Sequence, residues 1–288
     1  MSSLLSDIPA WIRAAEGQQV HLRQAVHCVL EAIVRTPRLR ELLCMKGGIL
    51  MALHYESPRY TTDVDFSTPE PFTDTAEQET IKLMSSVLPG MGELLGYDVE
   101  CRLQGHKVKP NRHGTRVSLA MSVGYAMKGT SSHRRLLSGN APHTLSIDFS
   151  FRERIPVSEE VEIGEGGRLC VYGLTTLIAE KMRALLQQPI RNRYRRQDVF
   201  DLDYLLERRP ELMLPEWKLQ VLQDLRMKCE DRDVPLSAGS FDDPAVAERA
   251  ERDYLTLLVE VDGNVPDFAP AFERVQSYFR ALPWSRNE

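Results

Sequence analysis

The spacing of apolar residues changes along this 288-residue chain, and that change constrains its fold more than any other feature. From about residue 98 to 172, apolar and polar residues alternate, a pattern typical of β-strands with one buried face. After Thr175 the apolar residues recur at a spacing near 3.6, which is typical of amphipathic helices. The sequence therefore predicts an α/β (α+β) domain over 1–172, with a mixed sheet and flanking helices, and a mostly helical domain over 173–288.

The same patterns place individual elements. The helical spacing of the first forty residues ends at Pro37. Further helices are expected over 49–55, 75–88 and 174–187. Strands are expected over 42–46, 62–67, 99–103, 116–123, 144–151, 160–163 and 169–172.

Two neighbouring motifs precede the alternating region. Lys46-Gly47-Gly48 joins a short apolar strand to a helix, and glycines let backbone N–H groups approach phosphate oxygens closely. On the next expected strand, Asp63 and Asp65 lie on one face, about 7 Å apart by strand rise, while Val64 and Phe66 pack the other. Such a pair of acids suits divalent metals that bridge a triphosphate, so the two motifs indicate nucleotidyl transfer.

The strand over 144–151 carries a third acid. Its apolar residues face one way, whereas Ser146, Asp148 and Ser150 face the other. If this strand neighbours the one with Asp63 and Asp65, Asp148 completes a carboxylate triad that needs cations such as Mg²⁺. A half-exposed strand with a solvated aspartate is the alternative, which the neighbouring Asp63-Val64-Asp65 motif makes less favoured.

Lys181 lies within the apolar stripe of the helix over 174–187, where a leucine would be expected. A buried lysine needs an anionic partner, which a bound triphosphate would supply, although a side chain that reaches solvent from the stripe edge is the alternative. Further on, Asp198 and Asp201 share one helical face. Asp198 could also be a helix N-cap.

The net charge of −5 does not favour nucleic-acid binding, but the basic residues are clustered. An acidic protein can still present a basic face to phosphates, although solvated surface charge explains either cluster equally well. The candidates for RNA contact are Lys107, Lys109 and Arg112 in one cluster and Arg191, Arg193, Arg195 and Arg196 in the other. Tyr194, within the second, would suit a stacked base.

Composition and the absence of targeting patterns bear on where in the cell the protein is found. Five cysteines without a CxxC pair argue against disulfides and structural zinc, and favour small buried side chains. The first seven residues lack the pattern of a signal peptide, and no apolar run is long enough to span a membrane. We therefore expect a cytoplasmic protein without membrane contact.

The motifs together resemble a known family. The segments Lys46–Tyr55, Arg59–Phe66, Glu180–Leu185 and Arg196–Leu202 resemble, in order, the KGGxxL, RxSxDxDF, EKxxAL and (K/R)-x-D-x-x-D-L segments of AbiEii-type toxins. These toxins, of AbiE and MenAT systems, belong to the polymerase-beta-like nucleotidyltransferase superfamily. The resemblance implies a nucleotidyltransferase fold.

The resemblance also implies roles for single residues. Asp63 and Asp65 would bind Mg²⁺ or Mn²⁺, and Lys181 and Asp198 would complete the catalytic site, with Asp201 as the alternative to Asp198. The nucleotide would be held by Lys46, Gly47, Gly48, Arg59 and Thr61. Thr61 stands where the family usually has a serine that some antitoxins phosphorylate.

The implied activity is that of a toxin–antitoxin enzyme. It would transfer NMP, with a pyrimidine the favoured base, from an NTP to the 3′ end of tRNA, and so block aminoacylation and translation. A cognate antitoxin is expected as partner. Two alternatives stay open: an acceptor that is a protein hydroxyl or a small molecule, and a catalytically silent module that binds RNA or a partner.

Overall fold

The computed structural model describes residues 4–5, 7–114, 116–163 and 167–285. The chain divides into two compact units, each of which packs mainly within itself. The first contains 1–54, 61–153 and 159–171, and the second contains 55–60, 154–158 and 172–288. The sequence places a domain boundary at 172/173, but no sequence pattern indicates that the two short segments join the second unit.

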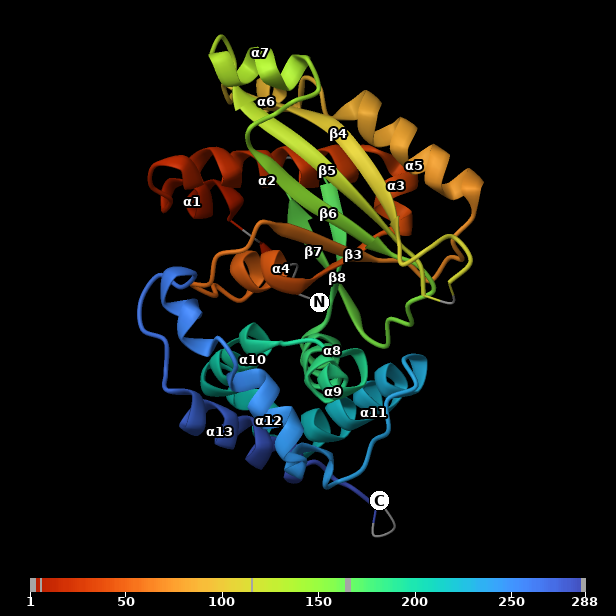
Figure 1. The fold of residues 1–288 in the computed structure, drawn as a ribbon, viewed down its shortest axis with the longest axis vertical. Helices are drawn as coiled ribbons and strands as arrows, with labels where there is room; N and C mark the ends of the chain where they lie inside the picture. The colour runs from red at the N-terminus through yellow and green to blue at the C-terminus, as the bar shows by residue number, and fades with distance from the viewer. Residues whose placement is uncertain (1–3, 6, 115, 164–166, 286–288) are drawn as a thin grey trace. The chain divides into compact units, whose positions relative to one another are not determined.

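The first unit is built on an eight-stranded mixed sheet of order β1-β7-β8-β2-β3-β6-β5-β4 (Figure 1). The central strand β3 pairs antiparallel with β2 and parallel with β6. The strands are β1 Leu4–Leu5, β2 Cys44–Lys46, β3 Asp63–Ser67, β4 Val99–Lys109, β5 Ser118–Met127, β6 Thr144–Ser150, β7 Ser158–Ile163 and β8 Gly167–Tyr172.

Helices surround this sheet. The longest, α2, contacts β4, β5 and β6, and its residues from Ala25 to Val34 are all buried because the helices α1, α3, α5 and α6 also pack against it. The helices of this unit are α1 Ile8–Arg13, α2 Gln18–Arg35, α3 Pro37–Leu42, α4 Gly47–His54, α5 Asp74–Val87, α6 Met91–Leu94 and α7 Ser131–Leu137. Pro37 ends the spacing of α2 and begins α3, which suits a residue without a backbone N–H.

The second unit is mainly helical. Helix α8 packs against α11, and α10 packs against α13. The helices are α8 Leu174–Leu186, α9 Gln188–Arg191, α10 Arg196–Arg208, η1 Pro210–Met213, α11 Pro215–Asp231, η2 Ser240–Asp242, α12 Pro244–Glu251, η3 Tyr254–Val259 and α13 Phe268–Arg280. The predicted fold class, a mixed α/β sheet region followed by a helical region, is confirmed.

Several expectations can be compared directly with these elements. The predicted strands all occur, although β4 continues to Lys109, six residues beyond its predicted end. Four cysteines are buried and Cys170 is half-buried, which agrees with their interpretation as small apolar groups. The expectation about a signal peptide concerns residues 1–7, of which 1–3 and 6 lie outside the described residues.

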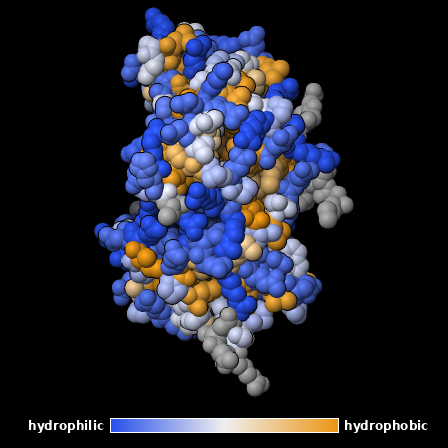
Figure 2. Space-filling model, turned by 90° about the vertical axis from the view of Figure 1, so that its right-hand side faces the viewer, coloured by the Kyte–Doolittle hydropathy of each residue, from blue (hydrophilic) through white to orange (hydrophobic). Residues whose placement is uncertain are grey.

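In the described part of the chain, no helix combines the length and the apolar character that a membrane span requires. On the face shown in Figure 2, apolar residues form small patches among hydrophilic ones.

Candidate functional site

The acidic face of β3 has the predicted geometry. Val64 and Phe66 are completely buried, whereas Asp63 is exposed and Asp65 is half-buried. Phe66 stacks on Phe149 of β6, with 5.7 Å between ring centroids. This packing fixes the register of β3, because a shift of one residue would bury the carboxylates and expose the aromatic ring. The sheet therefore holds both carboxylates on its polar face.

Gly47 lies directly against this acidic face. Its φ of +77° falls in the region that favours glycine, and a Cβ built there would lie 2.3 Å from Oδ2 of Asp65. The turn between β2 and α4 can therefore approach the carboxylate only because residue 47 has no side chain. The first N–H groups of α4 begin at the same point, and helix N-termini attract anions.

Asp148 occupies the place that the sequence required for a third acid. Strand β6 is the parallel neighbour of β3, and Asp148 lies opposite Asp65 in the register. Its Oδ2 accepts a hydrogen bond from Ser118 at 3.4 Å and lies 3.6 Å from Nζ of Lys109. Lys109, a candidate for RNA contact, therefore pairs with an acid of the candidate site.

Lys46 is also engaged within the protein. Its Nζ donates to Oγ of Ser150 at 3.3 Å and lies 3.9 Å from the buried carboxylate of Glu153. Neither partner was identified from the sequence. The alternation puts Ser150 on the polar face of its strand, but Glu153 follows the strand in a segment without a repeating pattern. A phosphate role for Lys46 stays a prediction.

The second unit holds a compact cluster of four charged side chains. Nζ of Lys181 lies 2.5 Å from Asp201 and 3.2 Å from Asp198. Arg59 donates to both oxygens of Asp201 through Nε and Nη2, at 2.9 and 2.8 Å. All four residues are at most 9% exposed, so the two cations and two acids neutralise each other away from water.

The cluster shifts the pKa values of its members. Burial alone would raise the pKa of Asp201, but the charges of Arg59 and Lys181 outweigh it and lower that pKa to about 2. Burial likewise opposes the charged form of Lys181, yet Asp201 and Asp198 hold its pKa above the ordinary value. The same balance, dominated by Asp201, raises the pKa of Arg59. All three groups are therefore charged at neutral pH.

This cluster corrects two interpretations of the sequence. Lys181 does not reach solvent from the edge of its helix, since it is 5% exposed and bonded to two acids. Asp198 is not an N-cap, because Arg195 precedes the first residue of α10 and Asp198 lies inside the first turn. Arg59, expected at the nucleotide, forms a bidentate ion pair with Asp201. The link from Arg59 to Asp201 spans 142 positions, and no local pattern in the sequence indicates it.

The two basic clusters differ in their partners. Arg112 forms ion pairs with Asp74 and Glu77, so much of the charge beyond β4 is compensated. Arg196 binds Glu260. Arg191 and Arg193, from the same cluster as Arg196, are exposed and have no ion pair among the described residues.

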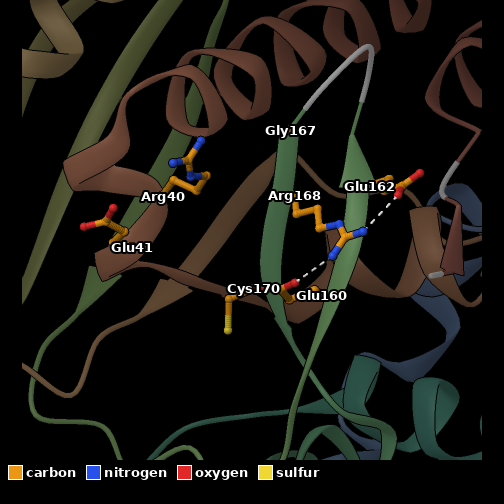
Figure 3. A pocket seen from close by; sticks show the side chains of 7 residues that line it. All are labelled: Arg40, Glu41, Glu160, Glu162, Gly167, Arg168 and Cys170. Atoms are coloured by element: carbon orange, nitrogen blue, oxygen red, sulfur yellow. Dashed lines mark hydrogen bonds and ion pairs between the residues drawn. The ribbon is translucent and has the colours of Figure 1, made fainter. Parts of the chain in front are cut away.

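A cavity of about 620 Å³ in the first unit contains none of the predicted site residues (Figure 3). Its lining residues are Arg40, Glu41, Glu160, Glu162, Gly167, Arg168 and Cys170. Arg168 lies 3.5 Å from both Glu160 and Glu162, so its positive charge is compensated within the wall. We assign no chemistry to this cavity, and the acidic face of β3 remains the candidate site.

The carboxylates fit a hard metal ion in part. Among the residues that the structure describes, no three or more His, Cys, Asp and Glu side chains are grouped so as to hold a metal. Magnesium sites in nucleotide enzymes often use only one or two carboxylates, with substrate phosphates and water as the other ligands. Asp63 and Asp65, on the open face of β3 beside the Gly47 turn, fit this type of site.

Solved structures define the class of fold. The chain is similar to MenT4, a nucleotidyltransferase toxin from Mycobacterium tuberculosis H37Rv, at 17% identity over 97% of this chain and 90% of that chain, with a TM-score of 0.54. It is also similar to JHP933 from Helicobacter pylori, at 14% identity over 93% of each chain, with a TM-score of 0.51. At these identities the comparison shows the fold, which is a nucleotidyltransferase fold.

The family follows from the sequence model that matches residues 29–278, described as the nucleotidyl transferase AbiEii toxin of type IV toxin–antitoxin systems. The chain belongs to this family, as the four motifs had suggested. Membership implies an NTP substrate and an antitoxin partner. A search of curated proteins found no match.

Proposed function

We propose that this toxin transfers an NMP unit, with a pyrimidine favoured, from an NTP to the 3′ end of tRNA. The observation that carries the proposal is the polar face of β3, where Gly47 abuts Asp65 and Asp148 lies opposite Asp65 on β6. Phosphate binding and carboxylate chemistry are both available at this one place. Addition of nucleotides to the tRNA end would block aminoacylation and so translation.

The residues of the first unit have distinct proposed roles. The N–H groups at the start of α4 would bind phosphate oxygens, and Lys46 would add a positive charge that Ser150 and Glu153 hold in position. Asp63 and Asp65 would hold Mg²⁺ or Mn²⁺, with Asp148 as the third candidate ligand. The metal, when bound, would neutralise phosphate charge during transfer.

The charged cluster of the second unit supports the activity in a different way. Lys181 and Asp198 are the proposed catalytic members, and Asp201 with Arg59 would hold them in place through their buried ion pairs. Because Asp201 makes the shorter contact with Lys181 and binds Arg59 at both oxygens, we assign it a positioning role. Asp198, with the longer contact to Lys181, is the better candidate for chemistry.

Regulation would involve the antitoxin. The hydroxyl of Thr61 accepts a hydrogen bond from the backbone N–H of Asp63 at 3.3 Å, and the residue is half-buried. A phosphate on Thr61 would place negative charge beside the acidic strand and oppose NTP binding. Substrates of this kind, tRNA and NTP, place the proposed activity in the cytoplasm.

The experiment uses Asp63→Ala, because Asp63 is exposed and its loss should not affect folding. Purified protein is incubated with labelled CTP, tRNA and Mg²⁺, and growth is followed during expression. We expect no labelled tRNA and no growth arrest. Asp98→Ala, which alters an exposed aspartate on another part of the first unit, should behave like the wild type. If the Asp63 variant labels tRNA at the normal rate, the assignment of the site is wrong.

The alternative acceptors are tested with the same labelled nucleotides. Incubation with total RNA, lysate protein and aminoglycosides separates an RNA acceptor from a protein hydroxyl or a small molecule. A catalytically silent module would show no NTP binding in the presence of Mg²⁺ by calorimetry.

A further inference from the structure

An unpaired group of arginines stands out on the second unit. Arg191, the last residue of α9, and Arg193, between α9 and α10, are exposed, and Arg195 is half-buried. In the described ranges of the chain, no carboxylate lies within ion-pair distance of any of the three. Many exposed arginines elsewhere do have such partners, as Arg154 has in Asp231 at 2.5 Å.

Two arginines from α12 and its C-cap join this group. Their guanidinium carbons lie over the ring of Tyr194, at 4.3 Å from its centroid for Arg252 and 5.4 Å for Arg249. Arg252 also donates to the hydroxyl of Tyr194, and Arg249 donates to Oδ1 of Asn192 at 3.0 Å. Within the part of the chain that the structure describes, the only carboxylate in ion-pair distance of either is Asp253, 3.9 Å from Arg252.

These contacts indicate that Tyr194 has a structural role. A guanidinium over an aromatic ring is attracted by the ring's electron density and loses side-chain freedom. Tyr194 therefore orders Arg249 and Arg252 while much of their donor capacity stays available to a ligand. A stacked base, suggested by the sequence for Tyr194, would compete with these two arginines for the ring.

We propose that Arg191, Arg193, Arg249 and Arg252 form a phosphate-binding surface for the RNA acceptor, ordered by Tyr194. We call it the Tyr194 surface. It rests on the proposed function, because RNA is the acceptor there, and it adds two arginines that no sequence motif included.

Charge and residue type favour a phosphate backbone as ligand. In a protein of net charge −5, uncompensated arginines repel one another unless a polyanion binds them. All four cations are arginines, whose planar donor groups match phosphate oxygens in pairs. An acidic protein segment is the competing ligand, and the experiment includes it.

The experiment measures RNA binding rather than catalysis. The affinity of a 5′-fluorescein-labelled tRNA transcript is measured by anisotropy at several salt concentrations, for the wild type and for R249A/R252A. We expect the double variant to bind about tenfold more weakly or worse. The slope of log affinity against log salt should become shallower by about 1.4 to 1.8, as for two lost phosphate contacts.

Two further variants separate ordering from charge. Tyr194→Phe keeps the ring and should bind almost normally, whereas Tyr194→Ala frees both arginines and should weaken binding without changing charge. R280A removes an exposed arginine that pairs with Asp242, and serves as the control for lost charge. Equal affinity and slope for R249A/R252A and R280A would overturn the proposal.

The ligand and the function are tested separately. If R249A/R252A loses affinity for a labelled polyglutamate peptide but keeps its affinity for tRNA, the surface binds acidic protein and our assignment fails. If tRNA binding depends on the surface but no nucleotide is transferred to tRNA, the surface stands and the proposed function fails. If tRNA is labelled normally and binding is unchanged in the double variant, only the surface is wrong.

Discussion

The acidic face of β3 and the charged cluster around Lys181 contain similar residues in opposite surroundings. Asp63 is exposed and Asp65 half-buried, at the surface of a sheet whose core is Val64 and Phe66. Asp201 is completely buried and bonded to two cations. One region leaves its carboxylates at least partly exposed to solvent, whereas the other buries its carboxylates in an ion cluster.

The difference teaches how each region should respond to mutation. Loss of an exposed carboxylate should cost the fold little, but it would remove a proposed ligand for the metal and substrate. Loss of one member of a buried ion cluster leaves an opposite charge without a partner in a poorly solvated place. Mutations in the first region should therefore change mainly the enzyme activity, and mutations in the second should change mainly the free energy of unfolding.

The largest expected effect on stability is that of Asp201→Asn. This change keeps the size of the side chain but leaves Arg59 and Lys181 with a neutral partner, and it should lower the free energy of unfolding by about 3–5 kcal/mol. Urea denaturation, followed by circular dichroism, measures the change. Asp63→Asn is the matched control in the first unit, and should stay within about 0.5 kcal/mol of the wild type. Equal stabilities for the two variants would remove the contrast between the regions.

The next prediction compares the pH dependence of stability for two aspartates of α10, Asp201 and Asp203. Burial raises the pKa of Asp203 to about 6, even though Arg274 opposes the shift, whereas the pKa of Asp201 is lowered to about 2. Asp203 holds its proton more tightly in the folded state, so its contribution to stability should fall as pH rises from about 4 through 6, by at most about 3 kcal/mol. Asp201 acts in the opposite sense, and its stabilisation should be lost as pH falls from about 4 to 2.

Denaturation of the wild type and Asp203→Asn across this pH range separates the two groups. In the variant, the free energy of unfolding should no longer fall as pH rises from 4 to 6. It should still fall as pH drops below 4. If the curve between pH 4 and 6 is the same in both proteins, Asp203 is not the group that titrates there.

The smallest expected change in stability concerns Gly47→Ala. The added Cβ would meet the carboxylate of Asp65, and the alanine would have to adopt a φ of +77°. Together these should lower the free energy of unfolding by about 1–3 kcal/mol. Because the same turn is proposed to bind phosphates, the affinity for NTP should fall with stability, as calorimetry can measure. Gly90 also has a positive φ, but a Cβ added there would meet open space. Gly90→Ala is therefore the control for backbone strain. If both variants lose the same stability and neither loses NTP affinity, the contact with Asp65 has no special role.

Local patterns predicted most of the fold because they record burial directly. Alternation along β3 and β6 gave the correct faces for Asp63, Asp65 and Asp148, since a strand can bury only alternate side chains. The spacing in α8 likewise placed Lys181 among buried residues. The long extension of β4 was missed, because its polar end lacks a buried face.

Partners of charged groups could not be predicted in the same way. The motif with Arg59 and the motif with Asp201 were both recognised, but an ion pair over 142 positions leaves no periodic trace. The same holds for Lys46 with Glu153 and for Tyr194 with Arg252. Contacts of this kind depend on how the chain returns to itself.

The sequence by itself determined the class of fold, the family and the residue types of the candidate site, because periodicity and short motifs are local properties. Only the tertiary structure decided that Lys181 is bound by two aspartates and that Gly47 touches Asp65. It alone also brought Arg249 and Arg252 to Tyr194. The physical reason is that charge compensation and close approach act across space between distant segments, whereas hydrophobic patterning acts along the chain.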